Sequence, residues 1–356
     1  MEITISIGGL TIKPKQHILK PVLFLALTIT VVILTLPSMI IVLFSSERAP
    51  IEEPKQVNQL ENEPTVMVNV ERASTQTIES VPLEDYVASV VASEMPAEFE
   101  PEALKAQALA ARTYIIQYML ATGTLETEPT ITDTVQHQVY KNRKELKDQW
   151  GADYSWKMEK ITDAVAQTTN QILTYDDEPI TPAFFSTSNG KTENAEDYWE
   201  NALPYLVSVD SPWDLDSPKF LDQKSIPIAE VEERLGLTVS GPLTDPAMTY
   251  TDSGRVETIE LFGKNFSGRE IREKLDLRST DFAIDYSDGY LVFTTKGYGH
   301  GVGMSQYGAN GMAEDGMSYQ EIISHYYPGV EITDLAESDH AQFVFGHQSS
   351  ESTETN

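Results

Sequence analysis

The stretch from residue 81 to residue 115, VPLEDYVASVVASEMPAEFEPEALKAQALAARTYI, predicts two consecutive helices. The first helix begins near Pro82 and must end before Pro96, because the residue before a proline disfavours helical geometry. A second helix follows at about 102–120, and its many alanines allow another helix to approach closely. The first helix carries one apolar stripe with i, i+3, i+4, i+7, i+8 spacing, formed by Leu83, Tyr86, Val87, Val90 and Val91.

The next position on this stripe is Glu94, where a carboxyl group replaces an aliphatic side chain. Glu94 also lies in the last helical turn, where the negative end of the helix dipole disfavours a second negative charge. Burial and dipole both raise a carboxyl pKa, and a raised pKa suits a general acid near neutral pH. The plainer interpretation is a glutamate at a helix end that reaches solvent.

Composition restricts the possible partners and chemistry. The 356 residues carry a formal net charge of −30, and such a surface repels phosphate backbones, so we expect no nucleic-acid partner. Cysteine is absent, which excludes disulfides and thiolate metal sites.

Residues 21–46 contain no charged side chain and are mostly Leu, Ile, Val, Phe and Thr. The run exceeds the roughly 20 apolar residues that span a bilayer. Three lysines precede it and glutamates follow it, so the positive-inside rule places residues 1–20 in the cytoplasm and the rest outside the cell membrane. A cleaved signal peptide is the alternative, although its apolar region is usually shorter.

Beyond the predicted anchor, the sequence indicates an α+β fold with a helical part that carries Glu94 and a β-rich part. The expected divisions are an acidic stalk at 47–64, a folded extracytoplasmic domain at 65–333 with its β-rich part at 205–295, and a disordered polar tail at 334–356. Expected elements of the domain are a strand at 66–70, a helix at 156–171, a strand, turn and strand over 172–188, a hairpin around 287–289, and a helix that opens with a Ser318–Glu321 capping box.

Two other chemistries have weak sequence support. Ser188 and Lys191 satisfy the S-x-x-K spacing of a serine peptidase, but the S-D-N and K-T-G elements that accompany it are missing. His137, His300 and His325 are the histidines of the domain, and they are scattered, without the close spacing of a zinc site. A wall serine or zinc peptidase and a non-catalytic wall-binding scaffold therefore remain alternatives.

Five blocks of sequence, in order along the chain, resemble the family of stage II sporulation protein D and its relatives. The first is the stretch 81–115 itself, and the similarity extends over about 65–332. The other four are FFSTSNGKTENAEDYW at 184–199, PYLVSVDSPWD at 204–214, LDLRSTDFAI at 275–284 and GYGHGVGMSQYGANGMAEDGMSYQEIISHYYPG at 297–329.

The resemblance implies a lytic transglycosylase of peptidoglycan with Glu94 as its catalytic residue and no cofactor or metal. Such an enzyme cleaves the bond between N-acetylmuramic acid and N-acetylglucosamine without water and leaves a 1,6-anhydro end. The family's sporulation members act on glycan strands that a partner amidase has stripped of peptides. The resemblance also implies a complex with stage II sporulation proteins M and P in the mother-cell membrane, which degrades the septal wall during engulfment.

Side chains for substrate binding are proposed among polar and aromatic residues near the expected site. Arg112 has the position on its helix to hold the carboxylate or a sugar oxygen, and a surface ion pair is its alternative role. The complete set is Arg112, His137, Tyr140, Ser186, Ser188, Lys191, His300, Gln306 and Tyr307.

Overall fold

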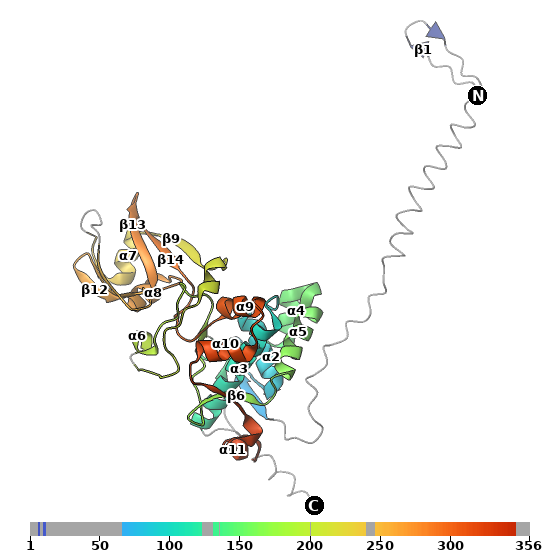
Figure 1. Ribbon diagram of the computed structural model, residues 1–356. Coiled ribbons are helices and arrows are strands. Elements are labelled where there is room, and N and C mark those ends of the chain that lie inside the picture. Colours follow the sequence, from blue (N-terminus) through green and yellow to red (C-terminus); the bar gives the residue numbers. More distant parts are fainter. Residues whose placement is uncertain are drawn as a thin grey trace, which may run out of the picture. The chain divides into compact units, whose positions relative to one another are not determined.

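The computed structural model describes residues 6–7, 10–11, 66–122, 131–134, 136–199, 201–239 and 246–346 (Figure 1). The chain divides into two units, Met1–Glu53 and Pro54–Asn356. The described part of the first unit is a short antiparallel hairpin of β1 (Ser6–Ile7) and β2 (Leu10–Thr11). The second unit contains helices and several small sheets, which confirms the α+β prediction.

No helix within the described ranges is both long enough and apolar enough to cross a bilayer. The predicted anchor at 21–46 and the predicted stalk at 47–64 lie outside the described residues. Both therefore stay predictions.

Helices α2 (Leu83–Glu94) and α3 (Pro101–Thr122) pack against each other within the larger hydrophobic core. The predicted boundaries of α2 are confirmed, since Met95 after it is already extended. Five α3 alanines between Ala103 and Ala111 are buried, and α2, α5, α9 and α10 all contact this helix. Small side chains on α3 thus allow several elements to gather around one axis (Figure 1).

The third predicted helix differs from the observed one. Helix α5 (Tyr154–Ala166) ends earlier than expected, because the chain turns through Asn170, whose φ is 61°, to enter the next strand. Two elements before it were not predicted, α4 (Arg143–Trp150) and the short 3-10 helix η1 (Gly151–Asp153). Asn142 opens α4 with a capping box that includes Glu145.

A three-stranded sheet lies beside the first helices. Strand β3 (Met67–Glu71) pairs antiparallel with β4 (Ile78–Pro82) and parallel with β5 (Ile131–Thr132). Val68 and Val70 are buried in the core, so the alternating strand pattern is confirmed.

Two further small sheets join segments that are distant in the sequence. Strand β6 (Gln171–Tyr175) lies between β7 (Glu178–Pro179) and β16 (Glu331–Asp334). Strand β8 (Phe184–Phe185) pairs parallel with β15 (Met304–Ser305). This pairing brings residues 186–190, the STSNG segment, next to the glycine-rich block that begins at residue 297. Helices α9 (Gln306–Glu314) and α10 (Tyr319–Tyr326) follow, and the predicted capping box of α10 is confirmed.

The β-rich part has a second hydrophobic core, built by buried residues between Ile226 and Phe293. The predicted hairpin is present, and its turn residues Asp288 and Gly289 both have positive φ, as a two-residue turn requires. Two helices that we did not predict pack here, α7 (Ile228–Leu235) and α8 (Gly268–Leu275). One sheet has the order β13 (Asp281–Ser287), β14 (Tyr290–Lys296), β9 (Leu221–Pro227), and the other is β10 (Ala247–Tyr250), β11 (Val256–Leu261), β12 (Lys264–Ser267).

The predicted disordered tail is wrong for its first part. Residues 335–346 form the 3-10 helix η3 (Leu335–Glu337) and helix α11 (Ala341–Gly346), and Leu335 and Val344 join the larger core. Residues 347–356 lie outside the described residues. Two short elements complete the fold, α6 (Ala195–Trp199) and the 3-10 helix η2 (Pro212–Asp216).

Candidate active site

Glu94 is the last residue of α2, and its side chain is half-buried. The apolar stripe below it is fully buried, so the helix holds the carboxyl group at the edge of the core. Burial raises the pKa of Glu94, and a hydrogen bond from a backbone amide partly opposes this effect. The carboxyl group thus has the environment that the apolar stripe predicts.

That amide belongs to Val139, whose N–H donates to Glu94 Oε1 at 3.1 Å. No other residue in the described ranges donates a hydrogen bond to the carboxyl group or pairs a cation with it. The two oxygens therefore differ: Oε1 is oriented by the backbone, and Oε2 is free to exchange a proton.

Gln306 approaches Glu94 from the start of α9. Its Nε2 donates to the backbone carbonyl oxygen of Glu94 at 3.1 Å and lies 3.4 Å from Oε1 of Gln107 on α3. Gln306 is only 7% exposed, so it supports the end of α2 and has little surface for a sugar. Its predicted substrate role is corrected to support of the C-terminal end of α2.

Tyr307 and Ser186 lie next to this contact. The Tyr307 N–H donates to the carbonyl oxygen of Ser186 at 3.0 Å, and the Tyr307 ring meets Phe99 edge to face at 4.9 Å. Phe99 lies in the turn between α2 and α3. Tyr307 and Ser186 are both half-buried, and Tyr307 directly follows Gln306, which contacts Glu94. Their predicted sugar contacts stay predictions.

The segment that supplies the Val139 N–H also contains His137 and Tyr140. Nδ1 of His137 accepts from the Thr132 N–H, and burial lowers the pKa of His137, which favours the neutral ring. Tyr140 is 4% exposed and stacks on Tyr86 at 5.6 Å. Tyr140 therefore packs beneath the site, and its predicted sugar contact is corrected.

Arg112 is fully buried, at 0% exposure, and forms two hydrogen bonds with Glu84, at 2.9 and 2.6 Å. Its other donors meet the carbonyl oxygens of Gln171 and Val165. Both functions expected of Arg112, the carboxylate contact and the sugar contact, are therefore corrected. Arg112 forms an internal ion pair with Glu84 that joins α2 and α3, and it does not form the surface ion pair that was its alternative role.

Ser188 and Lys191 do not form a serine–lysine pair. Ser188 is fully buried and donates to Oδ2 of Asp214 at 2.6 Å. The Lys191 ammonium is exposed and lies 3.5 Å from Asp210. Ser188 is thus a structural residue, which removes both its predicted sugar contact and the basis of the serine-peptidase alternative.

Asp214 is a buried residue that the sequence analysis missed. It accepts hydrogen bonds of 2.6 Å from Ser188, Ser211 and Ser305. Burial raises the pKa of Asp214, and the three serine hydroxyls oppose that rise. Ser305 also caps α9, so Asp214 joins three of the sequence blocks to the helix that carries Gln306. The S-x-x-D spacing of Ser211 and Asp214 alone gives no signal for such a site.

His300 lies in an aromatic environment formed by the rings of Phe185, Tyr198 and Trp199, with centroids 5.2–5.7 Å away. Burial and nearby arginines lower the pKa of His300 to about 3, so the ring is neutral at physiological pH. These contacts are with α6 and β8, away from the contacts of Glu94. The three domain histidines have separate neighbours, and no group of three or more metal-ligating side chains occurs in the described ranges.

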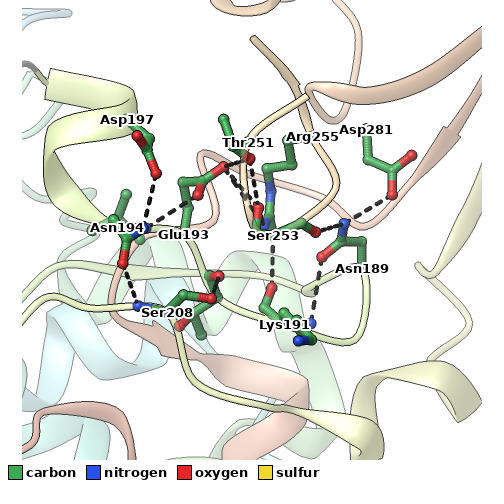
Figure 2. A network of polar contacts seen from close by, with 12 residues as sticks. Asn189, Lys191, Glu193, Asn194, Asp197, Ser208, Thr251, Ser253, Arg255 and Asp281 are labelled. Atoms are coloured by element: carbon green, nitrogen blue, oxygen red, sulfur yellow. Dashed lines mark hydrogen bonds and ion pairs between the residues drawn. The ribbon is translucent and has the colours of Figure 1, made fainter. Parts of the chain in front are cut away.

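A second polar network ties the STSNG segment to the β-rich part (Figure 2). Glu193 accepts hydrogen bonds from Thr251 and Ser253, both at 2.8 Å, and Arg255 donates to Ser253 and to the Lys191 carbonyl oxygen. Glu193 and Arg255 are each 2% exposed. The network is therefore a buried connection between the two hydrophobic cores.

Fold and site together define an α+β protein with a candidate acid–base carboxyl group at a helix end. A family model described as "Stage II sporulation protein" matches residues 71–175, which include Glu94 and Val139. The chain is 47% identical over 332 residues to stage II sporulation protein D of Bacillus amyloliquefaciens. This alignment covers 89% of the present chain and 96% of that protein. The chain is 50% identical over 272 residues to the Bacillus subtilis (strain 168) protein of that name, which covers 76% and 79% of the two chains.

The chain belongs to the stage II sporulation protein D family and is a sporulation protein. A more distant relative is the amidase enhancer of Bacillus subtilis (strain 168), 32% identical over 299 residues. That match covers 68% of this chain and 40% of the amidase enhancer.

Proposed function

We propose that this protein is a lytic transglycosylase that cleaves peptide-free glycan strands of peptidoglycan, with Glu94 as its catalytic residue. The observation that carries the proposal is the half-buried carboxyl group with one oxygen held by the Val139 N–H and the other free. Membership of the sporulation family supports a substrate in the cell wall.

In the first step, protonated Glu94 donates its proton to the glycosidic oxygen, and the bond from that oxygen to C1 of the muramyl residue breaks. In the second step, the Glu94 carboxylate takes the proton of the muramyl 6-hydroxyl while O6 bonds to C1. The product is a 1,6-anhydro ring, water is not consumed, and Glu94 regains its proton. A single carboxyl group suffices, whereas a glycoside hydrolase needs two.

The raised pKa of Glu94 supports the first step, because a larger fraction of the acid form is present near neutral pH. The Val139 N–H supports the second step, because it donates to the carboxylate form. Burial therefore favours the acid form that the first step needs, and the backbone N–H favours the carboxylate form that the second step needs.

The test is to incubate the full-length protein in detergent with peptide-free glycan strands and to analyse the ends by mass spectrometry. We expect anhydromuramyl ends from the wild type and a loss of at least about 100-fold in rate for Glu94→Gln, the usual size of an acid–base contribution. Glu98→Gln is the matched control, since Glu98 is an exposed glutamate four residues away whose carboxylate pairs with Lys157. Undiminished activity of Glu94→Gln would contradict the proposal.

Other outcomes identify the alternatives. Hydroxyl-terminated ends would indicate hydrolysis, and strands that bind without being cut would indicate a wall-binding scaffold. Cleaved stem peptides, with loss of activity on chelation, would indicate a zinc peptidase.

We also propose that residues 21–46 anchor the chain in the mother-cell membrane with the folded unit outside the cytoplasm. The uncharged run and the lysines before it support this topology. The relative called amidase enhancer, together with the family resemblance, supports an amidase as a partner. The full chain should stay in the membrane pellet after alkaline washing, and its release would contradict the anchor.

A further inference from the structure

The Val139 N–H lies in a segment without regular secondary structure. Residues 136–142 form neither helix nor strand and connect the β5 region to α4. The position of this N–H therefore depends on side-chain contacts that hold the segment. One buried arginine contacts the segment at Tyr140 and binds an acidic residue on each side of it.

Arg72, the residue after β3, is 5% exposed and binds acidic residues on both sides of the segment. Its Nε lies 3.2 Å from the Asp133 carboxylate, before the segment. Its Nη2 donates to both carboxylate oxygens of Glu145, in the first turn of α4. One guanidinium group thus holds both flanks of the segment.

Arg72 also contacts the middle of the segment. Its guanidinium carbon lies 5.1 Å from the centre of the Tyr140 ring, a cation–π contact. The hydroxyl group of Tyr140 donates to Glu79 at 3.4 Å, and Asn142 Nδ2 donates to the same carboxylate at 3.0 Å. Because Tyr140 is the neighbour of Val139, these contacts restrict the N–H that meets Glu94.

The charges around Arg72 make its role specific. Three carboxylates surround this guanidinium group, those of Glu79, Asp133 and Glu145. Without the arginine they would face one another with no counter-charge, and their repulsion would separate the flanks of the segment. A neutral replacement of similar size therefore cannot keep the same arrangement.

We propose that Arg72 is the positioning residue that holds the Val139 N–H against Glu94, through Asp133, Tyr140 and Glu145. The inference rests on the proposed function for its catalytic consequence, whereas the contact itself is independent of that function. Arg72 does not touch the carboxyl group and acts through the segment.

The hydrogen bond between Val139 and Glu94 determines in which direction the Glu94 pKa changes when Arg72 is replaced. The Val139 N–H stabilises the carboxylate form of Glu94, so its loss raises the pKa of Glu94 further. Among the residues that the structure describes, the lysines and arginines of the packed elements have partners of their own, so none of them is positioned to replace the lost N–H. The neutral titratable groups on the surrounding elements are Tyr86 on α2, Tyr114 and Tyr118 on α3, His137 and Tyr140 on the segment, and Tyr307 on α9. The charged groups are paired: Lys105 and Arg112 on α3 with Glu102 and Glu84, Lys141 on the segment with Gln149, Arg143 on α4 with Asp85 on α2, and Lys157 and Lys160 on α5 with Glu98 and main-chain carbonyls.

The test measures the Glu94 pKa by NMR titration of carboxyl carbons in the full-length protein, with Glu94→Gln to assign the signal. Arg72→Gln should raise this pKa by about one unit and lower kcat on peptide-free strands by about tenfold, with KM within about twofold. Arg72→Lys should restore part of both. Arg143→Gln is the matched control. Arg143 is the first residue of α4, the helix that contains Glu145, but it pairs with Asp85 on α2.

Val139→Pro removes the N–H directly and should raise the Glu94 pKa by the same amount. The double variant Arg72→Gln/Val139→Pro should show no further shift, because both changes remove one contact. An unchanged Glu94 pKa in folded Arg72→Gln would overturn the inference, as would additive shifts in the double variant. If Arg72→Gln does not fold, the comparison between Arg72→Lys and Val139→Pro decides in the same way.

The two proposals fail separately. A shifted Glu94 pKa in Arg72→Gln, together with an active Glu94→Gln variant, would support the role of Arg72 and refute the proposed function. An inactive Glu94→Gln variant together with an unshifted pKa would do the reverse.

Discussion

The two ends of helix α2 each carry a glutamate, and the two are used differently. At the first turn, Glu84 is matched by the buried guanidinium of Arg112 with two hydrogen bonds. At the last turn, Glu94 has one backbone N–H and no cation among its described neighbours. Both are acidic residues beside the same core.

The difference lies in how burial is compensated. A carboxylate with a bidentate arginine keeps its charge and joins two helices, so its chemistry is satisfied inside the protein. A carboxyl group with a single N–H and no cation has a pKa that burial raises, and one of its oxygens is available to a ligand. The comparison therefore separates a structural glutamate from a candidate catalytic one on a single helix.

The largest expected effect comes from breaking the matched pair. Arg112→Met should lower the free energy of unfolding by about 3–5 kcal/mol, because the half-buried carboxylate of Glu84 is left without its partner. Urea denaturation at pH 7 measures the loss. The double variant Arg112→Met/Glu84→Leu should recover most of it, and a stable single variant with a raised KM would instead restore the sugar-binding role of Arg112.

A smaller change in the free energy of unfolding, in the opposite direction, is expected when Glu94 is replaced. The folded pKa of Glu94 is raised, so folding favours the protonated form, and the ionised form lowers stability once the pH exceeds the unfolded value of about 4.5. Glu94→Gln should therefore raise the free energy of unfolding at pH 7 by about 1 kcal/mol. The gain should disappear below the unfolded pKa, and thermal unfolding across pH 4–8 measures it. A variant less stable than wild type at pH 7 would show that the charge of Glu94 contributes to the fold.

The smallest effect is expected at an exposed pair. Lys191→Ala should change the free energy of unfolding by less than about 0.5 kcal/mol, because its contact with Asp210 is solvated. If Lys191 binds glycan as predicted, KM should rise by up to about fivefold with kcat unchanged. Kinetics on peptide-free strands measure both constants, and a fall in kcat at constant KM would contradict a binding role.

Sequence patterns succeeded where the contacts are local. The apolar stripe and Pro96 correctly predicted the bounds of α2, and the Ser318–Glu321 box correctly predicted the start of α10. The hairpin at Asp288-Gly289 follows from the same kind of short-range rule. Such features depend on residues within about one or two helical turns of each other, so the sequence pattern alone predicts them.

Long-range contacts explain the predictions that failed. Ser188 and Tyr140 have polar groups suited to sugars, yet Asp214 and Glu79 take those groups, and these partners lie 26 and 61 residues away. The tail beyond residue 334 is polar on average, but Leu335 and Val344 are buried in the larger core, and Phe343 and Phe345 pack against it. Composition cannot show which partner each group will find.

The sequence by itself determined that Glu94 stands on an apolar stripe at a helix end, because helical periodicity places it there. It also carries the five blocks that resemble one family. Only the tertiary structure decided that the Val139 N–H meets Glu94, that Arg112 belongs to Glu84, and that Arg72 holds both flanks of the Val139 segment. These pairings join residues that are tens of positions apart, and the packing of β3, α2 and α4 around one core brings them together.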